Sequence, residues 1–237
     1  MLMFSVLMPC YNVRSFVEFA IESVVQQTYR HWEIVIVDDG STDGTLDAVD
    51  AVLRRYSNYS ISVIQQSHKG CTAATKCAIN HARGDICTVL DGDDLLTRDS
   101  LEVIREGFRA HPKVGFLWTR WKHTGDLRCW TKDLPRDLNL KEALLSGWWG
   151  AQAQRAFRRG AFLETKGLDP SILLATDLQL AALFAELGCD TLSINKVTYI
   201  YRSHRNQSSR IAHEIQSDSA KRIIRRLRKG GFARAKK

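Results

Sequence analysis

The chain has 237 residues, of which 44% are hydrophobic, and this length permits one large domain or two small ones with a proper core. No apolar run approaches the roughly 18 residues that a membrane-spanning helix needs. The net charge of +8 comes from the end of the chain: the segment after residue 218 holds nine Lys and Arg and no acid, which leaves 25 basic against 26 acidic residues in the body. A nearly neutral body argues against a nucleic-acid-binding face, and we expect no nucleic-acid partner.

Cysteine usage and the N-terminus indicate a cytoplasmic protein. The six cysteines form no C-x-x-C pair and no Cys/His cluster with zinc spacing. Such scattered cysteines are typical of reduced thiols in the cytosol. The apolar start "MLMFSVLMPCYN" lacks a basic region and a small-residue cleavage site, so it predicts a strand rather than a signal peptide.

Strands and helices alternate along the first half of the chain. The strands lack polar alternation, as expected when both faces of a sheet are covered, and the helices carry apolar residues at helical spacing. Strands are predicted at 4–9, 33–37, 60–66, 85–90 and 114–118, and helices at 14–28, 45–57, 70–82 and 100–111. This order predicts an α/β fold, a Rossmann-like and mostly parallel sheet with helices on both faces.

The pattern loosens after residue 118. Four tryptophans there, Trp121, Trp130, Trp148 and Trp149, fit either core packing or a ring platform for a sugar. Helices are predicted at 160–167 and 177–188, followed by a strand at 197–201 and the polar "RSHRNQSS".

Acidic residues follow two of the predicted strands. Asp38 and Asp39 end the second strand, and Asp91, Asp93 and Asp94 follow the fourth. Ligands of open parallel sheets bind beyond these carboxyl ends, although a single acid there can simply cap a helix. Three carboxylates within four residues repel one another unless a cation lies among them, and hard oxygen ligands suit Mg²⁺ or Mn²⁺. No G-x-G-x-x-G or G-x-x-x-x-G-K-[ST] motif offers an alternative phosphate site.

Five motifs together resemble family 2 glycosyltransferases, which have the GT-A fold. They are "SVLMPCYN", "EIVIVDDGSTDGT", "HKGCTAATKCAINHARGD", "VLDGDD" and "YRSH". Each is weak alone, but they occur in the family's order over about residues 4 to 207. The resemblance implies a single GT-A domain over 1–218, with a nucleotide-sugar-binding half at 1–117, an acceptor and catalytic half at 118–218, and a basic tail at 219–237.

The resemblance places a nucleotide-sugar along the strand ends. Asp39 is expected to accept hydrogen bonds from the nucleobase, while Asp38 is structural. The family's A-R-N triplet is here Ala74, Thr75 and Lys76, so its arginine is absent, and a lysine cannot make the same bidentate contact. The residues expected to bind the donor are Pro9, Tyr11, Asn12, Asp39, Lys76, Asp91, Gly92 and Arg202.

The resemblance also implies a divalent cofactor, Mn²⁺ or Mg²⁺. Asp93 is expected to coordinate the ion that bridges the diphosphate, with Asp91 and His204 as further ligands. Asp94 either joins these ligands or caps the next helix.

The expected catalytic base is Asp177, in "LLATDLQLAALF". The family often has Glu-Asp at this point, and here the glutamate is replaced by Thr176. From the residues alone, an Asp before "LQLAALF" is also a good helix cap.

These features predict a metal-dependent, inverting transfer of a sugar from a nucleotide-sugar, most simply a UDP-sugar, to an acceptor hydroxyl. The acceptor is expected to be a saccharide or a lipid-linked saccharide in glycan or polysaccharide biosynthesis. One alternative is a non-catalytic sugar-nucleotide-binding protein of the same fold. A signalling receiver domain also pairs acids at a strand end, but it leaves "DGDD" unexplained.

The basic tail allows two interpretations. "SAKRIIRRLRKGG" places Ile223, Ile224 and Leu227 together on a helix with basic residues around them. This pattern fits an interfacial helix on anionic lipid, which would hold the protein at the inner face of the membrane. It fits a solvated, disordered basic end equally well.

Overall fold

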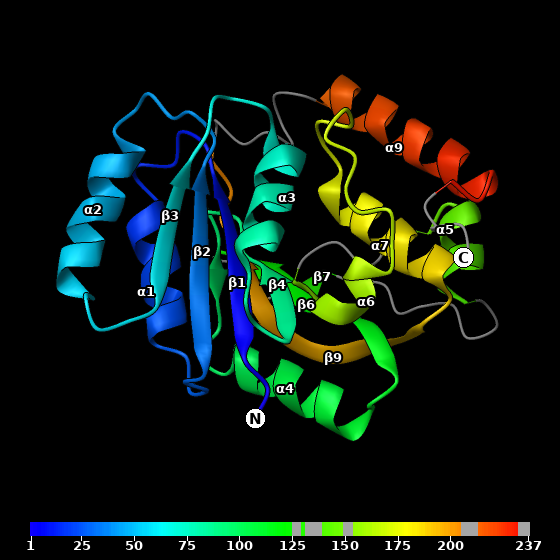
Figure 1. Ribbon diagram of the computed structural model, residues 1–237, viewed down its shortest axis with the longest axis horizontal. Coiled ribbons are helices and arrows are strands. Elements are labelled where there is room, and N and C mark those ends of the chain that lie inside the picture. Colours follow the sequence, from blue (N-terminus) through cyan, green and yellow to red (C-terminus); the bar gives the residue numbers. More distant parts are fainter. Residues whose placement is uncertain (125–128, 131–138, 149–153, 205–212, 232–237) are drawn as a thin grey trace.

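A computed structural model describes residues 1–124, 129–130, 139–148, 154–204 and 213–231. Within these residues, nine strands form one sheet in the order β3-β2-β1-β4-β8-β6-β9-β5, and β7 pairs with β6. Figure 1 shows the arrangement of the helices around this sheet. The strands are β1 (Phe4–Cys10), β2 (Trp32–Asp38), β3 (Ile61–Gln65), β4 (Ile86–Val89), β5 (Leu95–Leu96), β6 (Val114–His123), β7 (Cys129–Trp130), β8 (Arg155–Arg158) and β9 (Asp190–Tyr201).

The first four strands are parallel, as the sequence predicts. The strand β8 was not predicted; it runs antiparallel between β4 and β6. Its first residue therefore lies at the edge where β1, β2 and β4 end. The strand β9 is parallel to β6 and antiparallel to the short β5. The sheet is thus mixed beyond β4, and the edge where β1, β2 and β4 end also holds strands that run in the opposite direction.

Helices cover both faces of the sheet, as predicted, because side chains alternate along its strands. Val6 and Met8 of β1 pack with α1, α2 and α4, whereas Leu7 packs with the other helices. The helices are α1 (Val17–Val25), α2 (Thr45–Arg55), α3 (Cys71–His81), α4 (Ser100–Ala110), α5 (Leu140–Leu145), α6 (Arg159–Leu163), α7 (Thr176–Leu187) and α9 (His213–Arg228).

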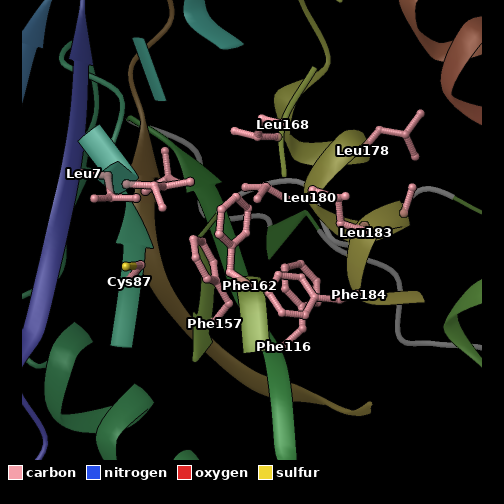
Figure 2. Packing of buried hydrophobic residues seen from close by; sticks show 14 of the residues in the cluster. Leu7, Cys87, Phe116, Phe157, Phe162, Leu168, Leu178, Leu180, Leu183 and Phe184 are labelled. Carbon is pink, nitrogen blue, oxygen red and sulfur yellow. The ribbon is translucent and has the colours of Figure 1, made fainter. Parts of the chain in front are cut away.

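The helix α7 is buried on nearly all sides because "TDLQLAALFAEL" is apolar around its whole circumference. Figure 2 shows the ring of Phe184 beside those of Phe116 and Phe157 from the sheet. The centroid of the Phe184 ring lies 5.1 Å from that of Phe116 and 5.4 Å from that of Phe157. This packing anchors the C-terminal half of α7 on the sheet.

The basic segment forms α9, which packs on α5 and α7 (Figure 1). Ile223 and Leu227 are fully buried in the same core cluster as α7. Arg226 forms an ion pair of 2.8 Å with Asp169. Both interpretations of this segment are therefore corrected: its apolar residues face the protein rather than lipid, and its helix is docked rather than disordered. Residues 232–237 lie outside the described part.

The described tryptophans mostly pack in the core. Trp118 is 1% exposed, and its ring lies edge-on to Trp148 at 5.8 Å. Trp121 packs against Tyr201 at 5.5 Å. Trp121 and Trp148 are partly buried and pack against the edge of the core, so for them the choice between core packing and a sugar platform stays open. The side chain of Trp130 and all of Trp149 lie outside the described residues.

Two simpler expectations can be compared with the structure. The five cysteines whose side chains are described are free thiols, as predicted. Within the described residues, no helix is both long and apolar enough to span a bilayer.

Candidate functional site

The acidic turn after β4 is held close to the loop after β1. In this turn, the N–H of Asp94 donates to the carbonyl of Asp91 at 2.9 Å. A Cβ at Gly92 would lie 2.6 Å from Cys10 Sγ, so glycine is needed for the two loops to approach this closely. Gly92 therefore brings Asp91 and Asp93 beside the strand end that carries Pro9.

Asp94 fastens the end of β9 to this turn. Its carboxylate accepts hydrogen bonds from the Tyr199 hydroxyl at 2.7 Å and from the Arg202 N–H at 2.8 Å. Burial, with the charges of Asp93 and Asp91, raises the pKa of Asp94 well above its usual range. Asp94 does not cap the next helix, whose N-cap is Asp99, and its role as a ligand stays a prediction. Its contacts tie the turn to the chain that leads to His204.

Asp93 and His204 are brought together, as predicted. Asp93 Oδ2 lies 2.9 Å from His204 Nε2, and these side chains are 21% and 15% exposed. The His204 ring stacks on Phe16 at 4.4 Å, and the Arg202 guanidinium lies 5.1 Å from the centre of the same ring. A carboxylate and an imidazole thus meet at the protein surface, held by aromatic packing.

Asp91 lies deeper, in a strongly charged environment. Burial raises its pKa to about 6; the Arg155 cation opposes this rise, and the carboxylates of Asp93 and Asp177 add to it. The Tyr199 hydroxyl donates a long hydrogen bond of 3.4 Å to Asp91 Oδ2. A cation at this point would relieve the repulsion. Within the described ranges, however, no group of three or more His, Cys, Asp or Glu is arranged to hold a metal by itself.

Arg155 was not among the predicted site residues; it is 6% exposed at the start of β8. Its carbonyl accepts a hydrogen bond of 3.0 Å from Thr88 Oγ1 on β4. Its side chain lies on the same face as Phe157, toward α7, because strand side chains alternate. Burial disfavours its charge, but Asp91 and then Asp177 raise the pKa of Arg155 above the usual value.

Asp177 lies in the first turn of α7 but is not its cap. The N-cap is Ala175, in the left-handed region at φ 62°, and no side chain caps the helix there. The capping interpretation of Asp177 is therefore wrong. Thr176 shares a hydrogen bond of 2.9 Å with Thr72 at the start of α3. This contact joins the first turns of two helices at the edge where Asp91 lies.

Asp39 holds the segment that leads into α3. It is 2% exposed and accepts hydrogen bonds from Gln66 Nε2 at 2.6 Å, from the Lys69 N–H at 2.9 Å and from the Gly70 N–H at 2.8 Å. His68 Nδ1 also lies 2.9 Å from its carboxylate. Its contact with a nucleobase stays a prediction, and such a contact requires this segment to exchange some of these bonds.

The loop after β1 is fixed against the loop after β2. Asn12 Oδ1 accepts from the Thr42 N–H at 2.9 Å, and the Asn12 N–H donates to Ser41 Oγ at 2.9 Å. Tyr11 is 44% exposed and stacks on His68 with centroids 4.0 Å apart. The ring of Tyr11 is therefore available at the surface, whereas Asn12 serves the loop structure.

Two further predictions concern the residues around this site. Asp38 is structural in part, since its Oδ2 accepts from the Ser41 N–H at 3.1 Å. Its buried Oδ1 has no hydrogen-bond partner among the described residues. Lys76, on α3, makes no hydrogen bond or ion pair within the described chain, and nothing there connects it to the acidic group; its donor contact stays a prediction.

Comparison with known proteins identifies relatives of the whole chain. The family model described as Glycosyl transferase family 2 matches residues 5–165. Chondroitin synthase of Escherichia coli is 27% identical over 232 residues, which cover 93% of this chain and 32% of that protein. The putative teichuronic acid biosynthesis glycosyltransferase TuaG of Bacillus subtilis is 39% identical over 101 residues, 41% of this chain and 38% of that one. The chain thus spans about a third of the length of these relatives.

Solved structures share the fold. TarS of S. aureus (1-349, in complex with UDP) superposes with a TM-score of 0.73 at 17% identity, covering 95% of this chain and 65% of that one. The mannosyltransferase PcManGT from Pyrobaculum calidifontis, in complex with GDP-Man and Mn²⁺, gives 0.66 at 23% identity, covering 86% and 57%. These likenesses establish the GT-A fold. The sequence match spans more than half of the chain, and the protein belongs to glycosyl transferase family 2.

Proposed function

We propose that the chain transfers a sugar from a nucleotide-sugar to an acceptor hydroxyl with inversion of configuration. The observation that carries this proposal is the gathering of Asp91, Asp93 and Asp177 at one sheet edge, with Arg155 among them. Arg155 is 6% exposed and the three carboxylates are partly buried. A structural role alone does not explain charges gathered this closely, because like charges that are poorly solvated disfavour the folded state.

Asp177 is the proposed general base. It begins a buried helix whose packing fixes its position, and the buried Arg155 cation favours its ionised form. An ionised carboxylate here can accept the proton of an acceptor hydroxyl as that oxygen attacks the anomeric carbon. General base catalysis of this kind contributes about 10²–10⁴-fold.

The donor's diphosphate is proposed to lie over Asp93 and His204. These two residues and Asp91 fit Mn²⁺ or Mg²⁺ in chemistry, since they offer carboxylate oxygens and an imidazole nitrogen, with the remaining positions left for phosphate oxygens. When bound, such an ion would neutralise charge on the leaving diphosphate. Arg202 holds the loop that carries His204, through its bond of 2.9 Å to the carbonyl of Phe16.

The nucleotide is proposed to bind beside Pro9, Tyr11 and Asn12, with UDP as the simplest choice. Solved neighbours have been crystallised with UDP, UDP-GlcNAc and GDP-Man, which supports a nucleotide-sugar donor. The exposed Tyr11 ring is a suitable stacking surface for a base.

The acceptor is proposed to be a saccharide or lipid-linked saccharide of polysaccharide biosynthesis. This assignment is supported by the names of the relatives, a chondroitin synthase and a putative teichuronic acid glycosyltransferase. The sheet edge near Asp177 and Arg155 is the place where its hydroxyl would enter.

We also propose that α9 contacts anionic membranes at the inner, cytoplasmic face by charge alone. With its apolar side docked on α7, its outer side exposes Lys221, Arg225, Arg228 and Lys229. Each basic residue close to an anionic surface contributes about 1 kcal/mol. Co-sedimentation with vesicles of phosphatidylglycerol should therefore fall steeply with salt, and binding that resists 0.5 M salt would contradict a purely electrostatic contact.

The function is tested by calorimetry with UDP, GDP, CDP and dTDP, with and without Mn²⁺, on wild type, Asp93→Ala and Asp177→Asn. One nucleotide should bind in a metal-dependent manner, lose that binding in Asp93→Ala and keep it in Asp177→Asn. In a transfer assay, Asp177→Asn should lower the rate about 10²–10⁴-fold and so nearly abolish transfer. Tight binding without any turnover by the wild type would instead support a non-catalytic nucleotide-sugar-binding protein.

A further inference from the structure

Five arginines surround an open cavity at the end of the sheet opposite the acidic site. The cavity has a volume of about 900 Å³ and lies where β1 and β4 begin, beside the last turns of α4 and the junction of β8 and α6. Strand β1 has seven residues, which separates the two edges by about 20 Å. The arginines are Arg83, Arg105, Arg109, Arg158 and Arg159.

Three of these arginines have acidic partners outside the cavity lining. Arg83 pairs with Glu33 at 2.7 Å. Arg105 pairs with Glu102 at 2.7 Å, and Arg109 pairs with Glu106 at 2.8 Å. The glutamates of α4 line a different groove, between α4 and β9. These pairs orient the guanidinium groups and still leave donors directed to the cavity, since each arginine has five.

Arg158 and Arg159 have no acidic partner among the described residues. Arg158 donates to the carbonyls of Val114 and Phe108 at 2.9 Å and 3.1 Å. The Nε of Arg159 is buried, and it has no hydrogen-bond partner in the described chain. The side chain of Arg159 as a whole is partly exposed, so its terminal nitrogens, rather than the buried Nε, are the donors that an anion in the cavity can reach.

Two acids also line the cavity. The carboxylate of Asp85 accepts a hydrogen bond of 2.8 Å from the Met3 N–H, and its carbonyl accepts one of 2.9 Å from the Arg159 N–H. Glu164 is exposed and pairs with no cation within the described residues. Guanidinium groups outnumber carboxylates on the lining itself, but the three glutamates paired behind it balance the local charge. Selection of an anion therefore depends on the guanidinium donors that face the cavity rather than on net charge.

We propose that this cavity binds an anion that carries two or more phosphate or carboxylate groups. Guanidinium groups bind both by paired, charge-assisted hydrogen bonds. The volume falls within the range of small-molecule sites, and the separation from Asp93 makes this a second site rather than an extension of the donor's. An oligophosphate and an acidic oligosaccharide with uronate groups are the two sources of this chemistry.

Calorimetry with the full chain tests the proposal, with sodium tripolyphosphate in one arm and a glucuronate-containing tetrasaccharide in the other. Both arms contain EDTA at constant ionic strength, which removes metal-bridged binding at the donor site. Arg159→Gln should weaken binding about tenfold to a hundredfold, as expected for a charge-assisted hydrogen bond. The arm that binds identifies the source of the anion.

Two matched variants make the result specific. Arg98→Gln removes an exposed arginine before the opposite end of α4, and Asp93→Ala alters the donor site; both should bind the probe as wild type does. Binding of neither probe would overturn the proposal. Equal losses in Arg98→Gln and Arg159→Gln would do so too, since they would indicate diffuse surface charge. Loss of binding in Asp93→Ala would assign the anion to the catalytic edge instead.

Discussion

Replacing Asp91 by asparagine is expected to stabilise the metal-free protein at neutral pH. Burial, with Asp93 and Asp177 and against Arg155, raises the pKa of Asp91 from 3.8 to about 6. A difference of about two pKa units corresponds to about 3 kcal/mol. Because the folded protein holds this proton more tightly than the unfolded chain, stability falls as pH rises from about 4 to about 6, and the full penalty is present above that range. Asparagine cannot ionise, so it avoids the penalty.

The expected gain at pH 7.5 is about 1–3 kcal/mol in the free energy of unfolding. The lower value allows for the loss of a weak contact, since the Tyr199 hydroxyl is 3.4 Å from Asp91 Oδ2. Urea unfolding of Asp91→Asn and wild type in EDTA, at pH 4 and at pH 7.5, measures this gain in the free energy of unfolding. At pH 4 Asp91 is largely protonated in the folded state, so Asp91→Asn and wild type should then have similar stabilities.

Asp50→Asn is the matched control, because Asp50 is an exposed aspartate of α2. It should change stability little at either pH. The reasoning is refuted if Asp91→Asn is no more stable than wild type at pH 7.5, or if its gain is as large at pH 4. Such a result would mean that Asp91 is already solvated or compensated in the free protein.

Three other substitutions test separate features. Arg155→Gln should lower kcat about 10²–10³-fold. It should also shift the acidic limb of the kcat/KM profile to higher pH, because the Arg155 cation lowers the pKa of Asp91. Arg155→Lys keeps the cation and should retain the pH profile. Ile223→Ala should cost about 2–5 kcal/mol in urea unfolding, whereas a solvated tail would show no change. Gly92→Ala should cost about 1–3 kcal/mol, because its Cβ would lie 2.6 Å from Cys10 Sγ; thermal unfolding of Gly92→Ala with Cys10→Ala should recover part of the loss.

The parallel half of the fold follows from local sequence. Continuous apolar runs such as "EIVIV" identify strands buried on both faces, and the helices between them carry their own periodicity. The strands β5 and β8 have no such signal. They contain two and four residues, and they are strands only because partners far along the chain, β9 and β4, provide their hydrogen bonds.

The same limit applies to the site. Asp91 and Asp93 could be found because they form a short acidic motif at a strand end, whereas only the resemblance to family 2 glycosyltransferases singled out Asp177. Arg155 lies in "AQRAFRRG", where nothing local separates it from Arg158 or Arg159. Only the antiparallel pairing of β8 with β4 brings its first residue to the acidic edge.

The replacement of glutamate by Thr176 can be understood from the charges at this edge. Asp91, Asp93 and Asp177 already act on one another there, and Arg155 is the buried cation among them. A further carboxylate beside Asp177 would repel the negative charges at this edge and so disfavour the ionised form of the proposed base. The neutral hydroxyl of Thr176 instead bonds to Thr72 and ties α7 to α3. A Thr176→Glu variant should thus lose the hydrogen bond to Thr72 and shift the acidic limb of the kcat/KM profile to higher pH. Thr176→Ser should keep both the hydrogen bond and the wild-type profile. An unchanged profile in Thr176→Glu would show that position 176 is electrostatically separate from the proposed base.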